Sequence, residues 1–116
     1  MKHKLIIGLS TPVLLFGKKK KKEVVAKVDT GATKTSIDIT LAKELGLGPE
    51  LKKTIVKSAH GTRHRSVVLL ELSIGGEIIE TEATLADRAH LKYPLLLGVN
   101  VLKKGFLIDP SKKRII

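Results

Sequence analysis

The spacing of the apolar runs is the feature that most constrains the fold of this 116-residue chain. Runs rich in Val, Ile and Leu, about four to eight residues long, alternate with Gly, Pro and lysine clusters, and this rhythm is typical of an all-β domain. No run reaches the roughly 20 apolar residues that a membrane-spanning helix needs. Since a chain of this length normally forms one domain, we expect a single all-β domain over residues 1–116, without membrane contact.

Strands are predicted wherever an apolar run is bounded by turn residues. They cover residues 4–9, 12–16, 23–28, 36–39, 52–60, 64–74, 77–85, 94–98, 105–109 and 114–116. One predicted hairpin has its tip at residues 60–63, and another turns at Gly75-Gly76, which supplies the positive φ angles of a two-residue turn. One or two short helices are expected, at residues 40–46 with Thr40 as N-cap and Gly46 as the stop, and at 99–104.

The charge predicts an anionic partner. The chain has 22 basic and 11 acidic side chains, a formal net charge of +11, and such a surplus attracts nucleic acid, anionic surfaces or acidic peptides. Only Phe16, Tyr93 and Phe106 are aromatic, too few for a base-stacking platform, so nucleic acid is disfavoured without being excluded. The lysines at 18–22 are interpreted as a solvated hairpin tip, with a dedicated anion site as the alternative.

Cysteine is absent, which excludes disulfides and thiolate metal sites and suits a reducing cytoplasm, the expected location. An apolar stretch at residues 5–16 follows Lys4 and loosely resembles a secretion signal. It is interrupted by Ser10, Thr11 and Pro12, and lysines follow where a cleavage site would lie. We therefore expect this stretch to form the first strands.

One stretch carries a candidate catalytic group, Val28-Asp29-Thr30-Gly31-Ala32. Asp29 stands at the end of a predicted strand, and the small residues after it let the backbone turn sharply and a ligand approach closely. The Thr30 hydroxyl and the Gly31 amide can both hydrogen-bond a carboxylate. Taken alone, these residues fit an ordinary β-turn at least as well as an active site.

The order of elements around this stretch resembles the retropepsin-like aspartic proteases. It is most similar to a microbial family that carries the name ATP-dependent zinc protease and is associated with ATP-grasp glutamate ligases. The similarity lies in AKVDTGA at 26–32, TS at 35–36, YPLLLG at 93–98 and FLIDP at 106–110. It spans about residues 5–113 and implies a closed retropepsin-like β-barrel or sandwich.

The resemblance also implies roles for individual residues. Asp29 would be the catalytic aspartate, within an active-site loop completed by Thr30, Gly31 and Ala32. The hairpin at 58–66 would be a substrate-binding flap, whose residues are His60, Gly61, Thr62, Arg63 and His64. Leu96, Leu97 and Gly98 would form the strand that supports the loop, and the chain ends near 1–9 and 112–116 would form a subunit interface.

Chemistry demands a second carboxylate, because aspartic proteases share one proton between two aspartates. The chain has one DTG loop, so a homodimer would have to supply Asp29 twice across its two-fold axis. The related enzymes usually hold an ion pair at the positions of Thr33 and Val99, so this dimer is expected to be held differently. No cofactor is implied.

The flap residues suggest the substrate. His60, Arg63, His64 and Arg65 are cationic or titratable and suit an acidic peptide or protein, and the glutamate-ligase association points to glutamate-rich segments. His60 and His64 are four apart on a hairpin, a spacing that does not place them on one helical face, so no metal site is predicted. Two other functions stay open: a non-catalytic module that binds acidic protein or ribosomes, and a nucleic-acid-binding β-barrel whose DTGA is only a turn.

Overall fold

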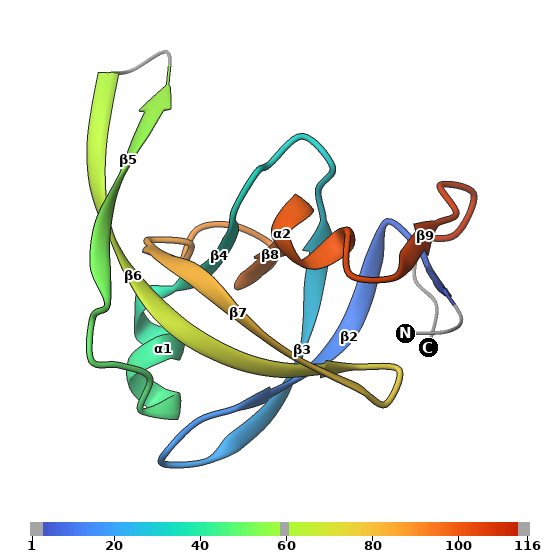
Figure 1. The fold of residues 1–116 in the computed structure, drawn as a ribbon, viewed down its shortest axis with the longest axis horizontal. Helices are drawn as coiled ribbons and strands as arrows, with labels where there is room; N and C mark the ends of the chain where they lie inside the picture. Colours follow the sequence, from blue (N-terminus) through green and yellow to red (C-terminus); the bar gives the residue numbers. More distant parts are fainter. Residues whose placement is uncertain (1–3, 59–60, 114–116) are drawn as a thin grey trace.

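The structure, a computed structural model, describes residues 4–58 and 61–113 (of Ser58, the backbone only) and is dominated by strands (Figure 1). The strands are β1 (Leu5–Ile7), β2 (Ser10–Phe16), β3 (Lys21–Val28), β4 (Thr35–Asp38), β5 (Lys52–Ser58), β6 (Gly61–Ile74), β7 (Glu77–Ala86), β8 (Leu95–Leu97) and β9 (Phe106–Ile108). Two short helices, α1 (Ile39–Leu45) and α2 (Val99–Leu102), accompany them. None of the helices in the described ranges is long and apolar enough to span a bilayer. The predicted all-β fold with short helices is confirmed.

Within residues 4–58 and 61–113, six strands close into a barrel. Their order is β2-β3-β8-β4-β7-β6, and β6 pairs back onto β2 to complete the ring. The pairs β3–β8 and β4–β7 are parallel, and the other pairs in the ring are antiparallel. β5 pairs only with β6 and extends the sheet beyond the ring. Closure hides most strand edges, as expected for a small β domain.

Leucine, isoleucine and valine from nearly all the ring strands fill the barrel. The largest fully buried aliphatic side chains are Leu15, Ile37, Leu45, Leu70, Leu72, Leu95 and Leu97. Burying each contributes about 1.5–3 kcal/mol, so the core supplies most of the favourable folding energy. β7 alternates over most of its length, because Ile79, Thr81 and Ala83 are buried and their neighbours at 78, 80 and 82 are exposed, whereas Thr84 and Ala86 near its end are both buried.

The start of α1 differs from the prediction. The Leu41 N–H donates to Asp38 Oδ2 at 3.3 Å, so Asp38 is the N-cap and the assignment to Thr40 is wrong. A carboxylate two residues earlier caps the helix because β4 runs directly into it, with Asp38 still extended. The predicted stop at Gly46 is confirmed, since Gly46 has φ 78° and donates to the last turn of the helix.

Of the two predicted hairpins, one has the predicted turn and the other has different bounds. The turn between β6 and β7 lies at Gly75-Gly76, with φ 56° and 86°, as predicted. The bounds of the other hairpin were wrong, because β6 already begins at Gly61, which pairs with Ser58. Its connection falls on residues 59–60, outside the described residues, so Thr62 and Arg63 are strand residues and not tip residues.

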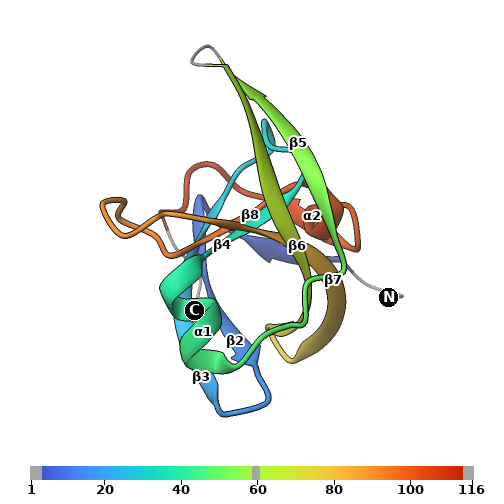
Figure 2. The same cartoon turned by 90° about the vertical axis from the view of Figure 1, so that its left-hand side faces the viewer.

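The β5–β6 hairpin and the β3–β4 loop lie at the same end of the barrel. Figures 1 and 2 both place the hairpin and the loop at the upper end and the β2–β3 hairpin at the lower end, and a hydrogen bond from Lys34 Nζ to Thr54 Oγ1 joins the loop to β5. β1 and β9 form a separate parallel pair on the side away from β5 (Figure 1). The strand predicted at 114–116 lies outside the described residues. The fold thus brings the DTGA loop and the predicted flap together.

Candidate active site

Asp29 follows β3 directly and is held by the backbone on both sides. Its N–H donates to Leu97 O at 3.0 Å, which continues the β3–β8 pairing, and its carbonyl accepts from the Ala32 N–H at 3.2 Å. The Gly31 N–H donates to Asp29 Oδ1 at 2.9 Å, so the turn itself orients the carboxylate. The Asp29 side chain is 29% exposed, and its Oδ2, which does not accept from the Gly31 N–H, is left for a ligand.

Two neighbours of Asp29 add to the site. Lys27, two residues earlier on β3, places Nζ 4.0 Å from Asp29 Oδ2. Because both side chains are partly exposed, this ion pair contributes little stability but makes the approach to the carboxylate positive. Thr30 is exposed, and its hydroxyl makes no hydrogen bond to any part of the chain that the structure describes.

The end of the Asp29 loop is attached to the start of α2 by its backbone. The Val99 N–H donates to Ala32 O at 2.8 Å, and the Asn100 N–H donates to Thr33 O at 3.2 Å. Thr33 and Val99 occupy the positions where related enzymes usually have an ion pair. Here main-chain hydrogen bonds join the same two segments within one chain, so charged side chains are not needed for that contact.

A buried network of side chains reinforces this attachment. Thr35 is fully buried; its hydroxyl donates to Asn100 Oδ1 at 2.8 Å and accepts from the Gly98 N–H at 3.1 Å. The Thr35 N–H also donates to Asn100 Oδ1 at 3.0 Å. The Asn100 amide then donates to Thr81 Oγ1 and Glu82 O, both at 3.0 Å. The side-chain donors and acceptors of Thr35 and Asn100 all have hydrogen-bond partners, so the network fixes the loop relative to β7 and β8.

β8, which contains Leu96 and Leu97 of the predicted supporting strand, pairs with β3 next to Asp29. Leu96 pairs with Lys27 and Leu97 with Val28, so β8 runs beside the end of β3 that leads to Asp29. Gly98 packs closely on the loop, because a Cβ at this position would lie 2.5 Å from the backbone C and O of Lys34. The residue after β8 must therefore lack a side chain for the loop to take this path.

The predicted flap is the β5–β6 hairpin, which extends from the barrel beside the Asp29 loop (Figures 1 and 2). Gly61, Thr62, Arg63 and His64 are exposed on β6, and His60 lies outside the described residues. In the described part of the chain, none of these residues lines the cleft next to Asp29. The hairpin contributes Arg65 of β6 and three residues of β5 instead, Ile55, Val56 and Lys57, which pair with His64, Arg63 and Thr62.

A cleft of about 510 Å³ lies between the Asp29 loop, the β5–β6 hairpin and the barrel. Gly31 and Ala32, next to the candidate aspartate, are part of its lining, and Lys34 of the same loop donates a hydrogen bond from Nζ to Thr54 Oγ1 on β5. Its described lining includes four cations and no carboxylate. The cations are Lys34, Lys57, Arg65 and Arg88.

Arg88 follows β7 and is held from two directions. Its N–H donates to Asp38 Oδ1 at 2.8 Å, and its Nε donates to Tyr93 O at 2.9 Å. Burial lowers the pKa of Arg88 and the charge of Arg65 lowers it further, whereas the carboxylates of Asp38 and Asp29 oppose both effects. The Arg88 guanidinium therefore lies in a partly desolvated, positive part of the cleft.

The structure offers no metal site within the described residues. No group of three or more His, Asp or Glu side chains there could hold a metal ion. His64 and His90 are both exposed and lie on different elements, His64 on β6 and His90 in the segment between β7 and β8.

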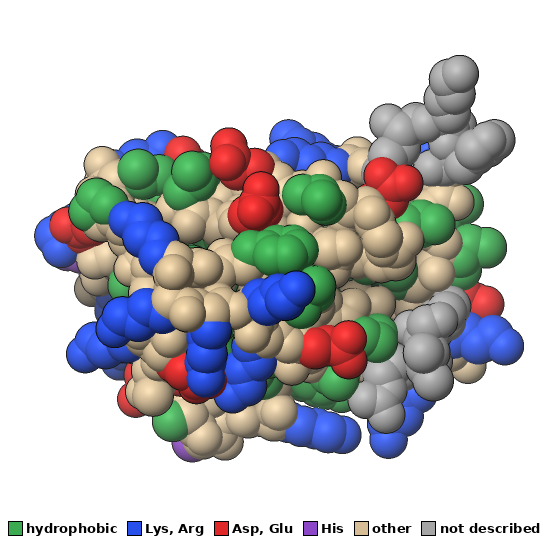
Figure 3. Space-filling view, turned by 90° about the horizontal axis from the view of Figure 1, so that it is seen from below, with side chains coloured by type: hydrophobic (Ala, Val, Ile, Leu, Met, Phe, Trp, Pro, Cys, Tyr) green, Lys and Arg blue, Asp and Glu red, His purple; other side chains and the backbone are tan. Residues whose placement is uncertain are grey.

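The lysine-rich hairpin lies far from the cleft, at the other end of the barrel. Glu44 of α1 pairs with Lys20 at 2.7 Å and Lys22 at 3.0 Å, and Lys18 donates to Gly48 O at 2.8 Å. The view from below shows basic, acidic and apolar side chains interspersed (Figure 3). This geometry fits the interpretation of residues 18–22 as a solvated hairpin tip.

Comparison with known families decides the assignment. The model of the RimB-like family, described as retropepsin-like aspartic endopeptidase RimB, matches residues 43–116, more than half of the chain. The chain belongs to the RimB-like family. The match leaves out the DTGA loop of this RimB-like protein, so the assignment rests on the flap, the LLLG strand and the C-terminal part. No curated protein sequence matches the chain.

Solved structures show the same fold. A Legionella pneumophila protein of unknown function matches with a TM-score of 0.65 and 23% identity, covering 93% of this chain and 94% of that one. The EIAV protease complexed with the inhibitor HBY-793 has a TM-score of 0.65 and 20% identity, with 81% and 84% covered. A retropepsin-like aspartic protease from Rickettsia conorii has a TM-score of 0.56 and 23% identity, with 84% and 75% covered. The predicted family and retropepsin-like fold are therefore confirmed.

Sequence reasoning missed several residues that shape the site. Asn100 lies two positions after the LLLG block at 95–98, and its amide could have indicated a hydrogen-bonding role beside the loop. Ser36 is a buried polar residue of β4 that lines the cleft, and its place in the TS pair at 35–36 gave no indication of that position. Arg88 gave no signal, because it lies in a loop and reaches the cleft only through the fold.

Proposed function

We propose that the chain is a homodimeric aspartic peptidase in which Asp29 and its copy from a second subunit form the catalytic pair. The observation that carries this proposal is the carboxylate of Asp29, oriented by the Gly31 N–H at 2.9 Å in a loop whose Gly31 and Ala32 line a cleft. Family membership and fold support the same chemistry. We further propose that residues 1–116 act as one domain, and in the cytoplasm, which the cysteine-free composition fits.

In the proposed reaction, the two aspartates share one proton. The ionised carboxylate accepts a proton from a water molecule, which attacks the peptide carbonyl, while the protonated partner donates a hydrogen bond to the carbonyl oxygen. The aspartate that took the proton from water then gives it to the amide nitrogen, the C–N bond breaks, and the intermediate collapses to a carboxylic acid and an amine. No acyl-enzyme forms and no cofactor takes part. Throughout the reaction, the Gly31 N–H donates to Asp29 Oδ1 and keeps the carboxylate oriented.

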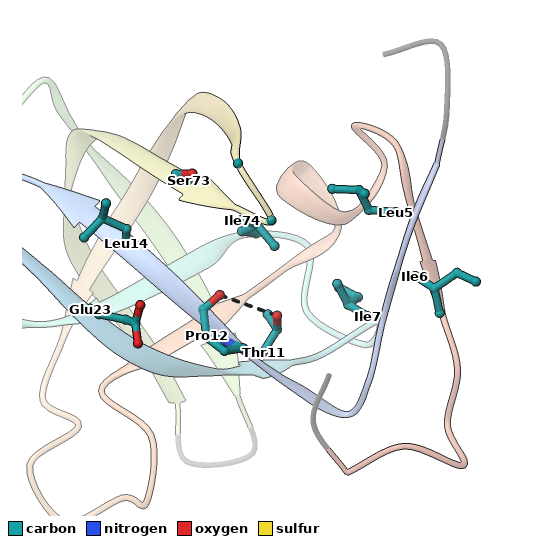
Figure 4. A pocket seen from close by; sticks show the side chains of 11 residues that line it. Leu5, Ile6, Ile7, Thr11, Pro12, Leu14, Glu23, Ser73 and Ile74 are labelled. Atoms are coloured by element: carbon teal, nitrogen blue, oxygen red, sulfur yellow. Dashed lines mark hydrogen bonds between the residues drawn. The ribbon is translucent and has the colours of Figure 1, made fainter. Parts of the chain in front are cut away.

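Two features of the single chain support a dimer. Thr30 is exposed beside Asp29 with no hydrogen-bond partner in the described residues, as expected if it meets the other loop across a two-fold axis. The β1–β9 pair also exposes apolar side chains, with Ile6 56% and Leu107 49% exposed. Figure 4 shows Ile6 pointing outward, beside an apolar hollow lined by Leu5, Ile7 and Ile74. We place the subunit interface on this face.

The substrate we propose is an acidic or glutamate-rich peptide segment. The four cations that line the cleft have no carboxylate beside them in its described lining, and a bound anionic peptide would supply one. Arg63 and His64, which pair with Val56 and Ile55 of the cleft lining, would extend this positive surface over the substrate. Acidic peptides should therefore be cleaved faster than neutral ones of the same length.

Asp29→Asn tests the proposal. This variant should lose hydrolysis of a peptide library that includes acidic members, while circular dichroism and solution mass remain unchanged. Asp87→Asn is the matched control, because it removes the same charge from an exposed loop and should retain activity. Unchanged hydrolysis by Asp29→Asn would refute the assignment. A monomeric protein that never hydrolyses peptides but binds acidic protein or RNA in a salt-sensitive way would favour a non-catalytic module.

A further inference from the structure

Ser36 has an unusual position for a hydroxyl group. It is 6% exposed, and its Oγ is the buried side-chain polar atom that, among the described residues, lacks a hydrogen-bond partner. Thr35 and Ile37 on either side face the core, and Ser36 faces the cleft beside Asp29. A buried hydroxyl without a partner destabilises the fold, so its place in a cleft points to a ligand that completes its bonding.

The strands around Ser36 make a floor for such a ligand. Ser36 pairs with Thr84 on β7 and with Leu96 on β8, and all three residues line the cleft. The Thr84 hydroxyl donates to Thr35 O at 3.4 Å and is therefore already used. Ser36 is left as the hydroxyl of this floor that can bind a ligand, next to the apolar surface of Leu96.

Two arginines complete the wall. Arg88 uses its N–H and Nε within the chain, and the remaining N–H groups of its guanidinium donate to no described residue. Arg65 reaches the same cleft from β6. The charge of Arg65 lowers the pKa of Arg88, since like charges repel most strongly where water is partly excluded. An anion bound between the two would relieve that repulsion.

We propose that Ser36, Arg88 and Arg65 form a subsite for the side-chain carboxylate of one acidic residue of the bound peptide. Ser36 and Arg88 are the specificity-determining residues, and the inference rests on the peptidase function proposed above. A planar carboxylate accepts two parallel hydrogen bonds from a guanidinium and a third from the serine hydroxyl. An amide of the same shape brings an NH₂ group against these donors and is rejected.

The position of the cleft ties this subsite to the reaction. Gly31 and Ala32 of the Asp29 loop are part of its lining, so a peptide that lies across Asp29 passes its entrance. The carboxylate of Asp29 also raises the pKa of Arg88 and so offsets part of the effect of burial. The acidic residue that is bound here therefore lies close to the scissile bond.

The test measures binding in the Asp29→Asn protein, where hydrolysis cannot interfere. Fluorescence anisotropy follows labelled alanine-based peptides in which one Glu, or a matched Gln, is moved through each position. One position should prefer Glu, and Arg88→Met and Ser36→Ala should each weaken binding of that peptide by roughly 10- to 150-fold. Binding of the Gln peptide should be unchanged. Lys103→Met, which removes an exposed cation at the end of α2, is the matched control and should leave both affinities unchanged.

Thermal unfolding separates this role from a structural one. Ser36→Ala removes an unpartnered hydroxyl, so its melting temperature should equal or exceed that of the parent while peptide binding falls. Arg88→Lys keeps the charge without the planar fork and should recover only part of the Glu preference. Equal losses for Glu and Gln peptides, a destabilised Ser36→Ala, or no binding of any peptide would overturn the subsite. A Glu preference without hydrolysis by the wild-type chain would instead refute the peptidase function alone.

Discussion

Thr35→Val replaces the hydroxyl at the centre of the Asp29 support with a methyl group of nearly the same shape. In the native chain this hydroxyl donates to Asn100 Oδ1 at 2.8 Å and accepts from the Gly98 N–H at 3.1 Å. The side chain is fully buried, so water cannot replace either bond. The variant therefore isolates the hydrogen bonds from the packing.

The two bonds set the magnitude. Leaving the Gly98 N–H buried without an acceptor costs about 1–3 kcal/mol, and losing the bond to Asn100 costs about 0.5–1.5 kcal/mol more. Asn100 Oδ1 still accepts from the Thr35 N–H, so no second orphan is created. The free energy of unfolding should fall by about 2–4 kcal/mol, a large share of the stability of a small domain.

Urea unfolding measures this loss. With a slope of roughly 2 kcal/mol per molar urea, the midpoint should fall by about 1–2 M. Thr11→Val is the control: Thr11 is 2% exposed, but its hydroxyl reaches only Pro12 O at 3.5 Å, the bond drawn in Figure 4. Its unfolding free energy should change by less than about 1 kcal/mol. Equal losses in the two variants would show that the Thr35 network does not hold the loop.

Two further changes test other contacts. Gly98→Ala should lower the free energy of unfolding by about 1–3 kcal/mol or more and reduce peptidase activity, because the new Cβ would lie 2.5 Å from the Lys34 backbone. Val99→Ala is the control. Val99 is 38% exposed, so this change should alter the free energy of unfolding by about 0.5 kcal/mol or less in the same urea titration. Glu44→Gln should lower the stability of the fold at neutral pH but not in acid. Hydrogen bonds from Lys20 and Lys22 lower the pKa of Glu44 below its ordinary 4.5, so its stabilisation is present above that value and is lost as the pH falls through the lowered pKa. Urea midpoints of wild type and Glu44→Gln should thus differ at neutral pH and converge in acid, and a difference that persists in acid would contradict this assignment.

Local signals in the sequence were enough for most of the elements and for the position of Asp29, whereas its catalytic role was inferred from the order of several blocks along the chain. Gly75-Gly76 specified its turn because few other residues adopt positive φ at both positions. The block from 26 to 32 placed Asp29 at the end of a strand, where the structure has it. Such features depend on neighbours in the chain, and they can be read without knowing the fold.

Features that depend on distant neighbours could not be read. The closure of the barrel by β2 and β6 joins segments far apart, and nothing local indicates it. Arg88 reaches the cleft only because Asp38 and Tyr93 hold it there. The choice of Asp38 over Thr40 as the N-cap depended on where β4 ends, and strand ends are set by pairing partners.

Mixing wild-type protein with Asp29→Asn protein tests the proposed dyad most directly. If each active site needs Asp29 from two subunits, mixed dimers are inactive. After subunit exchange, an equimolar mixture should then show about half the activity of the same amount of wild type alone, and a ninefold excess of the variant should leave about a tenth. Peptidase activity that stays constant as Asp29→Asn protein is added would contradict the account.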